Sequence, residues 1–163
     1  KLGEPVLPIV REFIVKKNEV NHALAIYRAI VGDDQAYKAF LVQALQERPP
    51  HDHRSVQGKQ ELIALLSEFN DDSLVDVLLP YLDDHSDDVQ AASIDALGKI
   101  SHEAVKTKLV SMLASEIHSA RVVRKVAQVV CDQKIAVEAN VKLSDVVLEE
   151  FAIRSGYLVP LHR

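Results

Sequence analysis

The tripeptide His51-Asp52-His53 has the residue types of a metal site. Two imidazoles separated by one residue can reach the same metal ion, and the carboxylate of Asp52 would be a third ligand. Two prolines precede the group and Arg54 follows it, which is typical of a solvated loop. Two interpretations therefore stand beside metal binding: an ordinary surface loop, and a loop in which His51, Asp52, His53 and Arg54 contact a partner. We predict no metal here.

Nucleophilic catalysis has no support in the sequence. Cys131 is the single cysteine and follows Val129 and Val130, so a small buried thiol is the expected state. One cysteine cannot form an internal disulfide, and we expect a cytoplasmic protein. The chain has no Gly-rich phosphate loop, no Gly-x-Ser-x-Gly turn and no paired cysteines. We predict neither a catalytic residue nor a bound cofactor.

Charge is distributed unevenly along the chain. Residues 71–100 hold eight Asp and one Lys, whereas residues 101–134 hold six basic and three acidic side chains. Arg121, Arg124 and Lys125 share one helical face because of their i, i+3, i+4 spacing. This face is either an ordinary solvated surface or a binding surface for an acidic peptide or a phosphate.

The overall composition narrows the class of protein. The chain has 19 basic and 24 acidic residues, a formal charge of −5, and 48% apolar residues. This mild acidity argues against a nucleic-acid partner, which needs a basic footprint. Apolar runs reach about five residues, far short of the roughly 20 that cross a membrane. The chain starts at Lys1, and we interpret it as a possible fragment of a longer repeat protein.

The elements that position these residues follow from a comparison of the chain with itself. The dipeptide His-Ser at 85–86 recurs at 118–119, and each copy precedes a helical pattern that starts at Val89 or Val122. Both spacings are 33 residues, and the preceding apolar helices match at 31. A period of 31 to 33 residues with two helices per unit indicates stacked helical hairpins.

We predict an all-α chain of about four hairpins, in units over residues 4–31, 35–69, 73–100 and 103–133. First helices are expected near 4–16, 35–47, 73–83 and 103–115, and second helices near 20–31, 55–69, 87–100 and 120–133. The second unit is about eight residues longer, and we place the extra residues at 47–55. Pro80 lies inside a predicted helix, where proline produces a kink.

Residues 78–84 and 88–98 resemble a HEAT repeat. That family has an apolar first helix, often with a mid-helix proline, then Asp, a Val-Arg-like start and an Ala-Leu-Gly ending; Gln90 stands where arginine is usual. The resemblance is good over 74–133 and loose over 4–69. It implies a right-handed α-α superhelix, a HEAT-like solenoid, whose second helices line a concave groove.

From this resemblance we predict a non-catalytic scaffold that binds a protein or peptide along the concave groove. The helical phase predicts which second-helix residues are exposed there. The predicted partner-binding residues are Gln90, Ala91, Ile94, Asp95, Arg121, Arg124, Lys125 and Gln128.

Catalytic HEAT-like families supply the alternative. Deoxyhypusine hydroxylases resemble this chain in fold and bind two irons through several His-Glu pairs, whereas His102-Glu103 is the one such pair here. A surface His before a first-turn Glu explains that pair. HEAT-like alkylpurine glycosylases use a basic groove with tryptophan, and this chain has no Trp. A bilin-lyase-like or metal-dependent HEAT-repeat enzyme or chaperone stays as the alternative function.

The tail from 135 to 163 breaks the repeat period. We predict one capping helix from Ser144 to Ser155, with Gly156 as its left-handed stop. Its apolar residues would cover the open end of the last hairpin, since a solenoid exposes an apolar end unless something covers it. The alternative is the start of a further unit.

Overall fold

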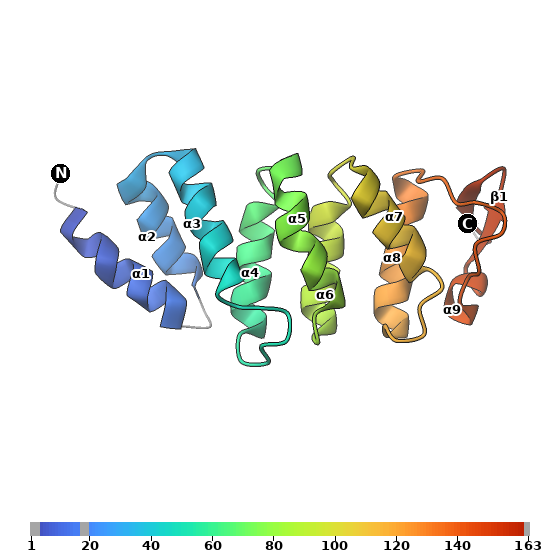
Figure 1. The fold of residues 1–163 in the computed structure, drawn as a ribbon, viewed down its shortest axis with the longest axis horizontal. Helices are drawn as coiled ribbons and strands as arrows, with labels where there is room; N and C mark the ends of the chain where they lie inside the picture. Colours follow the sequence, from blue (N-terminus) through green and yellow to red (C-terminus); the bar gives the residue numbers. More distant parts are fainter. Residues whose placement is uncertain (1–3, 17–19, 162–163) are drawn as a thin grey trace.

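The computed structural model describes residues 4–16 and 20–161, and it shows helical hairpins side by side in one row (Figure 1). A short 3-10 turn, Glu4–Val6, leads into the first hairpin. The α-helices of the four hairpins are α1 (Leu7–Lys16) and α2 (Asn21–Val31), α3 (Asp34–Gln46) and α4 (Val56–Leu66), α5 (Val75–Leu78) and α6 (Asp87–Leu97), and α7 (Glu103–Met112) and α8 (Ala120–Asp132). These bounds lie within a few residues of the predicted segments, and the loop between α3 and α4 spans 47–55.

The first helix of the third hairpin is broken, as Pro80 predicts. It consists of a 3-10 turn, Asp72–Leu74, then α5, then a second 3-10 turn, Leu79–Asp83, with Pro80 near the start of that turn. Proline has no N–H to donate and its ring crowds the preceding turn, so a regular α-helix does not continue through it. The tighter 3-10 geometry keeps Tyr81 and Leu82 buried.

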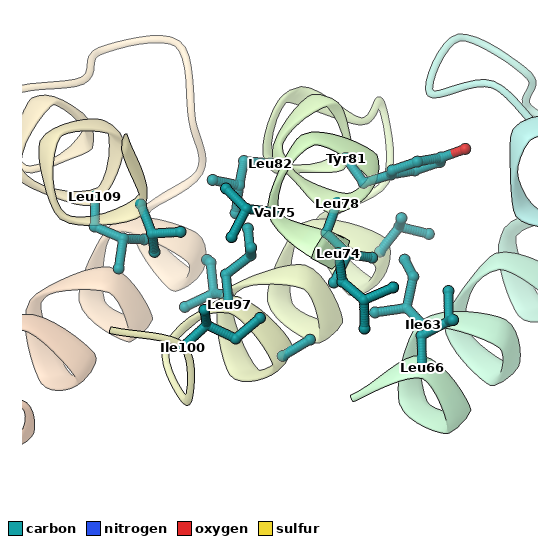
Figure 2. Close-up of a cluster of buried hydrophobic side chains, with 14 of the residues drawn as sticks. Ile63, Leu66, Leu74, Val75, Leu78, Tyr81, Leu82, Leu97, Ile100 and Leu109 are labelled. Atoms are coloured by element: carbon teal, nitrogen blue, oxygen red, sulfur yellow. The ribbon is translucent and has the colours of Figure 1, made fainter. Parts of the chain in front are cut away.

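One continuous apolar core runs through the row of hairpins. In the third hairpin, Leu74 and Leu78 point toward Ile63 and Leu66, while Val75 and Leu82 lie on the side of Leu97 and Leu109 (Figure 2). Tyr81 reaches α3, where its hydroxyl donates to the carbonyl oxygen of Leu45 at 2.7 Å. The first helix of the third hairpin therefore inserts side chains toward both the second and the fourth hairpin. Second helices also pack on one another, α4 on α6 and α6 on α8. Each hairpin thus shares its core with the hairpins beside it.

The tail closes the C-terminal end differently from the prediction. The predicted helix over 144–155 is wrong beyond its first turn: α9 (Asp145–Leu148) ends there, and β1 (Phe151–Arg154) and β2 (Tyr157–Pro160) form an antiparallel hairpin. Ser155 and Gly156 both have positive φ, which is the two-residue turn that suits the twist of a hairpin. Gly156 is therefore left-handed as predicted, but it joins strands.

The tail still covers the last second helix. α9 and β2 both pack against α8, and Val147, Phe151 and Leu158 are buried. Side chains alternate between the two faces of a strand, and this alternation places Phe151 and Leu158 toward the core. In the predicted helix an apolar stripe would have had this role. None of the helices in the described segments combines the length and the hydropathy that crossing a bilayer requires.

The close approach of α6 and α8 at Gly98 gives a test of the stacking. A Cβ on Gly98 would lie 2.7 Å from Cγ1 of Val129 and 3.0 Å from the carbonyl oxygen of Ile94. We expect Gly98→Ala to lower the free energy of unfolding by about 1 kcal/mol, because overpacking outweighs the better helix propensity of alanine. In a Val129→Ala background the same change should be neutral or stabilising, since Cγ1 is gone. Urea unfolding of the four proteins measures this coupling, and equal effects in both backgrounds would contradict the packing argument.

Candidate functional site

Three of the second helices, α4, α6 and α8, carry accessible side chains at helical spacing, and a set of these forms a surface that we call the second-helix face. On each of α4, α6 and α8, the exposed or half-buried side chains recur three or four residues apart, as the helical period requires. The second-helix face consists of Gln57, Ala64, Asp88, Ala92, Asp95, Arg121, Arg124, Lys125 and Gln128.

Ion pairs join α6 to α8 across this face. Asp88 Oδ1 lies 2.7 Å from Arg121 Nη1, and Asp95 Oδ2 lies 2.8 Å from Lys125 Nζ. The acidic excess of the third hairpin thus meets the basic excess of the fourth. The basic face expected on α8 is in fact neutralised by its neighbour, which nothing in the spacing of the basic residues alone could reveal.

Arg124 and Gln128 have local partners as well. Arg124 donates from Nε to Glu150 Oε1 at 2.7 Å, and its Nη2 lies 3.3 Å from Glu149 Oε2. These two glutamates follow α9, so Arg124 ties the last second helix to the tail. Gln128 Nε2 donates to Asp132 Oδ1 at 2.8 Å, within α8. The predicted residues of α8 are exposed or half-buried, and each of them forms an ion pair or a hydrogen bond with another side chain of the same molecule.

Three predicted groove residues are not exposed. Gln90, Ala91 and Ile94 are buried, with Ile94 fully inaccessible, so the prediction of their exposure is wrong. The reason is that α6 packs against α4, α8 and its own first helix at once, which leaves Asp87, at the start of the helix, and Asp88, Ala92 and Asp95 as its accessible residues. Gln90 donates from Nε2 to the carbonyl oxygen of Asp84 and is part of the core.

Hydrogen bonds and a contact between two histidine rings organise the 47–55 loop. Asp52 accepts from the backbone N–H of Arg54 at 2.9 Å and from its Nε at 3.2 Å, and these hydrogen bonds lower the pKa of Asp52 to about 2. The His53 ring lies against the His85 ring, with centroids 3.8 Å apart, and His51 is exposed. In the described part of the chain, no three His, Cys, Asp or Glu side chains converge as metal ligands would.

A hollow opens beside this loop. Its volume is about 560 Å³, and it is lined by Glu47, Pro49, His51, Asp52, His53 and Arg54. The four residues predicted as a loop contact, His51, Asp52, His53 and Arg54, therefore share one side of the loop. Whether a partner uses them stays a prediction.

The loop is held by a buried ion pair that the sequence analysis missed. Lys59 Nζ lies 2.6 Å from Asp84 Oδ2, and both side chains are 0% exposed. Lys59 also donates to the carbonyl oxygen of Pro50 at 3.3 Å, and the His85 ring nitrogen Nδ1 lies 3.0 Å from the same oxygen. Asp84 accepts in addition from the N–H of Ser86 at 2.9 Å. A lysine in the middle of an apolar stripe was the available signal, since an unpaired buried charge is too costly to persist.

The remaining candidates have local structural roles. His102 caps α7, accepting from the N–H of Ala104 at 3.2 Å on Nδ1, and Glu103 pairs with Lys106 at 2.6 Å, which lowers the pKa of Glu103. His102 therefore caps the N-terminus of α7, and Glu103 forms an ion pair within the first turns of the helix. Cys131 is half-buried, and burial raises the pKa of its thiol, which disfavours the reactive thiolate.

The comparisons with known proteins agree with the repeat architecture. A family model described as HEAT repeats matches residues 39–130, more than half of the chain. Neither the curated proteins nor the solved structures give a significant match.

The buried pair generates a stability prediction. We expect Lys59→Met to lower the free energy of unfolding by about 3–5 kcal/mol, because Asp84 is left buried without its partner. Lys38→Met is the contrasting variant: the Lys38 side chain is 11% exposed, but its partner Asp71 is 41% exposed and stays solvated when the lysine is lost, so we expect the smaller loss, about 1 kcal/mol. Urea unfolding measures both. Adding Asp84→Asn to Lys59→Met should recover part of the loss, and a further full-sized loss would contradict the ion-pair account.

The loop generates a pH prediction. Because the pKa of Asp52 is depressed to about 2 in the folded protein, its contribution to stability is present above an unfolded value of about 3.9 and is lost as the pH falls toward 2. We expect Arg54→Gln to raise the pKa of Asp52 toward its ordinary value, because the side-chain hydrogen bond is its largest cause. Carboxyl-carbon NMR titration reads this pKa directly. Lys142→Gln, remote in the tail, serves as the control, and an unmoved pKa in Arg54→Gln would rule out the assignment.

Proposed function

The chain belongs to the HEAT-repeat family, and on this basis we propose that it is a non-catalytic scaffold that binds a protein partner along the second-helix face. HEAT arrays commonly hold other proteins, and a stacked array presents an extended surface without reorganising. The proposal commits to a surface and to a class of partner.

The observation that carries the proposal is the direct packing of α4 on α6 and of α6 on α8. Three second helices share one core, so the side chains of their exposed stripes keep fixed spacings. A rigid surface loses little conformational entropy when a partner binds, which leaves more of the contact energy for affinity. The exposed stripe of a single isolated helix would not have this property.

The chemistry of the face supports a protein partner. Acidic side chains on α6 and basic side chains on α8 stand in pairs, so the surface is polar and close to neutral overall. An exposed ion pair contributes at most about 1 kcal/mol to the free energy of unfolding. A partner that offers its own charges can therefore replace such a pair at little cost in stability. Such a surface discriminates by the pattern of charge and not by its total, which suits proteins better than phosphate backbones.

Side chains that could take part in acid–base chemistry support the non-catalytic part of the proposal, because they are already engaged in local interactions. His102 caps a helix, Glu103 pairs with Lys106, and Asp52 is bonded to Arg54. Catalysis needs a base or nucleophile within hydrogen-bond reach of a substrate and of each other. These side chains instead satisfy the backbone and side-chain groups nearest to them.

A charge swap tests the proposed surface. In Asp95→Lys with Lys125→Asp the ion pair is kept and its direction reversed, so we expect a nearly unchanged free energy of unfolding but at least a tenfold loss of partner binding. Glu116→Lys with Lys142→Glu is the matched control, because that exposed pair joins the α7–α8 loop to the tail and neither residue belongs to the face. The readout is photo-crosslinking in a lysate of the native host, with the photoreactive residue placed at Gln128 and, for comparison, at the exposed Ser111 of α7.

We expect discrete protein adducts from position 128, absent in the swap and retained in the control. Adducts of equal yield from positions 128 and 111, or adducts that the swap leaves unchanged, would remove the second-helix face from the proposal. Iron, zinc or a pigment retained at one equivalent by the purified protein would instead favour the metal-dependent or bilin-lyase-like alternative.

A further inference from the structure

A second concave surface lies at the C-terminal end of the row, which we call the terminal cleft. It has a volume of about 630 Å³ and separates α7 from the chain that follows α8. One wall comes from α7 and from Ser101 in the loop before it, and the other from residues 133–141. The lining residues are Ser101, Glu103, Lys106, Thr107, Val110, Gln133, Lys134, Ile135, Ala136, Glu138 and Val141. None of them belongs to the second-helix face.

The backbone of Ala136 has the geometry of a sheet edge. Ala136 forms an isolated antiparallel bridge with Tyr157, and the N–H of Val137 donates to the carbonyl oxygen of Gly156 at 2.8 Å. This hydrogen-bond pattern makes Ala136 and Tyr157 a non-hydrogen-bonded pair, in which the N–H and C=O of both residues point away from each other. The donor and acceptor of Ala136 therefore point away from β2. Ala136 is exposed and lines the cleft. Neither its backbone N–H nor its C=O forms a hydrogen bond with any described residue.

Two opposite charges bracket this edge. Lys134 and Glu138 stand two residues before and two residues after Ala136, and both line the cleft. In the described part of the chain neither has an ion-pair partner, whereas the cleft's other two charges, Lys106 and Glu103, pair with each other. An added strand would thus meet a free cation at one end and a free anion at the other.

The walls of the cleft suit a peptide whose side chains alternate between apolar and polar. Val110, Ile135 and Val141 provide apolar surface, and Ser101 and Thr107 provide hydroxyl groups. An extended peptide directs successive side chains to opposite sides, so alternate residues would face the apolar wall and the solvent. Strand addition of this kind obtains affinity from main-chain hydrogen bonds and specificity from the side chains beside them.

We propose that the terminal cleft binds an extended peptide of a partner protein, which pairs by its backbone with Ala136 and carries an acidic residue toward Lys134 and a basic residue toward Glu138. The opposite charges fix the direction of the peptide, because like charges placed opposite each other on neighbouring strands are destabilising. The terminal cleft shares no residue with the second-helix face. It would therefore be a second binding site, at the end of the scaffold, that selects peptides by the order of their charged residues.

The test is a selection of random linear twelve-residue peptides, displayed on phage, against the whole chain. We expect enrichment of peptides with one acidic and one basic residue in a constant order. Lys134→Glu with Glu138→Lys should select the reversed order, since the two charges of the edge have been exchanged. A synthetic peptide from the first selection should bind this swapped protein at least tenfold more weakly than the unmodified one.

The role of the backbone is tested by a matched pair of prolines. Ala136→Pro removes the N–H and should weaken binding at least tenfold. Ala139→Pro is the control: Val141 donates to the carbonyl oxygen of Glu138, so Ala139 is the second residue of a turn, where proline is favoured, and binding should stay within twofold. Hydrogen exchange on the unmodified protein needs no variant, and the amide of Ala136 should exchange at least tenfold more slowly when the peptide is bound.

Several results would overturn the proposal. These are a selection without enrichment, a peptide whose binding Ala136→Pro leaves unchanged while the fold persists, and an Ala136 amide that the peptide does not protect. Selected peptides that lose binding in the Asp95–Lys125 swap, and not in the Lys134–Glu138 swap, would assign them to the second-helix face. The two proposals therefore fail separately.

Discussion

Burial of α6 on three sides at once is the constraint from which most of the surface chemistry follows. α6 packs on α4, on α8 and on its own first helix, so beyond its first residue, Asp87, the helix has the stripe of Asp88, Ala92 and Asp95 left for solvent. A hairpin of two helices cannot bury its apolar surface alone, and the neighbouring hairpins supply the rest of the core. The same close approach leaves no room for a side chain at Gly98.

Polar groups then adapt to the packing in two ways. Where the neighbouring second helices leave charges in solvent, acids on α6 and bases on α8 form exposed pairs that a partner can replace. Where the 47–55 loop folds over the third hairpin, Lys59 and Asp84 are inaccessible and depend on each other. Exposed pairs contribute little to stability and are suited to recognition, whereas breaking a buried pair is costly, which makes it a fixed joint between hairpins.

The tail has a different role from the repeats. Its β-hairpin and α9 cover α8, and Arg124 bonds to the glutamates between them, so the array's last apolar surface is closed. At the other end of the described chain, Ile26 of α2 is 52% exposed. The cap also creates the terminal cleft, because the segment that leads into it runs beside α7 before it pairs with β2.

The sequence by itself determined the helices of the four hairpins, the repeat and its extra loop, because apolar residues at helical spacing and turn residues such as those at 85–86 act over short distances. It also predicted the kink at Pro80, which depends on one residue's missing N–H. Only the tertiary structure decided that Gln90 and Ile94 are buried, that Lys59 meets Asp84, and that Lys125 faces Asp95. Those outcomes depend on how two neighbouring hairpins approach each other, and helical phase within one segment cannot say how many of its sides another segment will cover. The strands of the tail belong to the same class, since a four-residue strand is favoured by the partner it pairs with and the surface it covers more than by its own sequence.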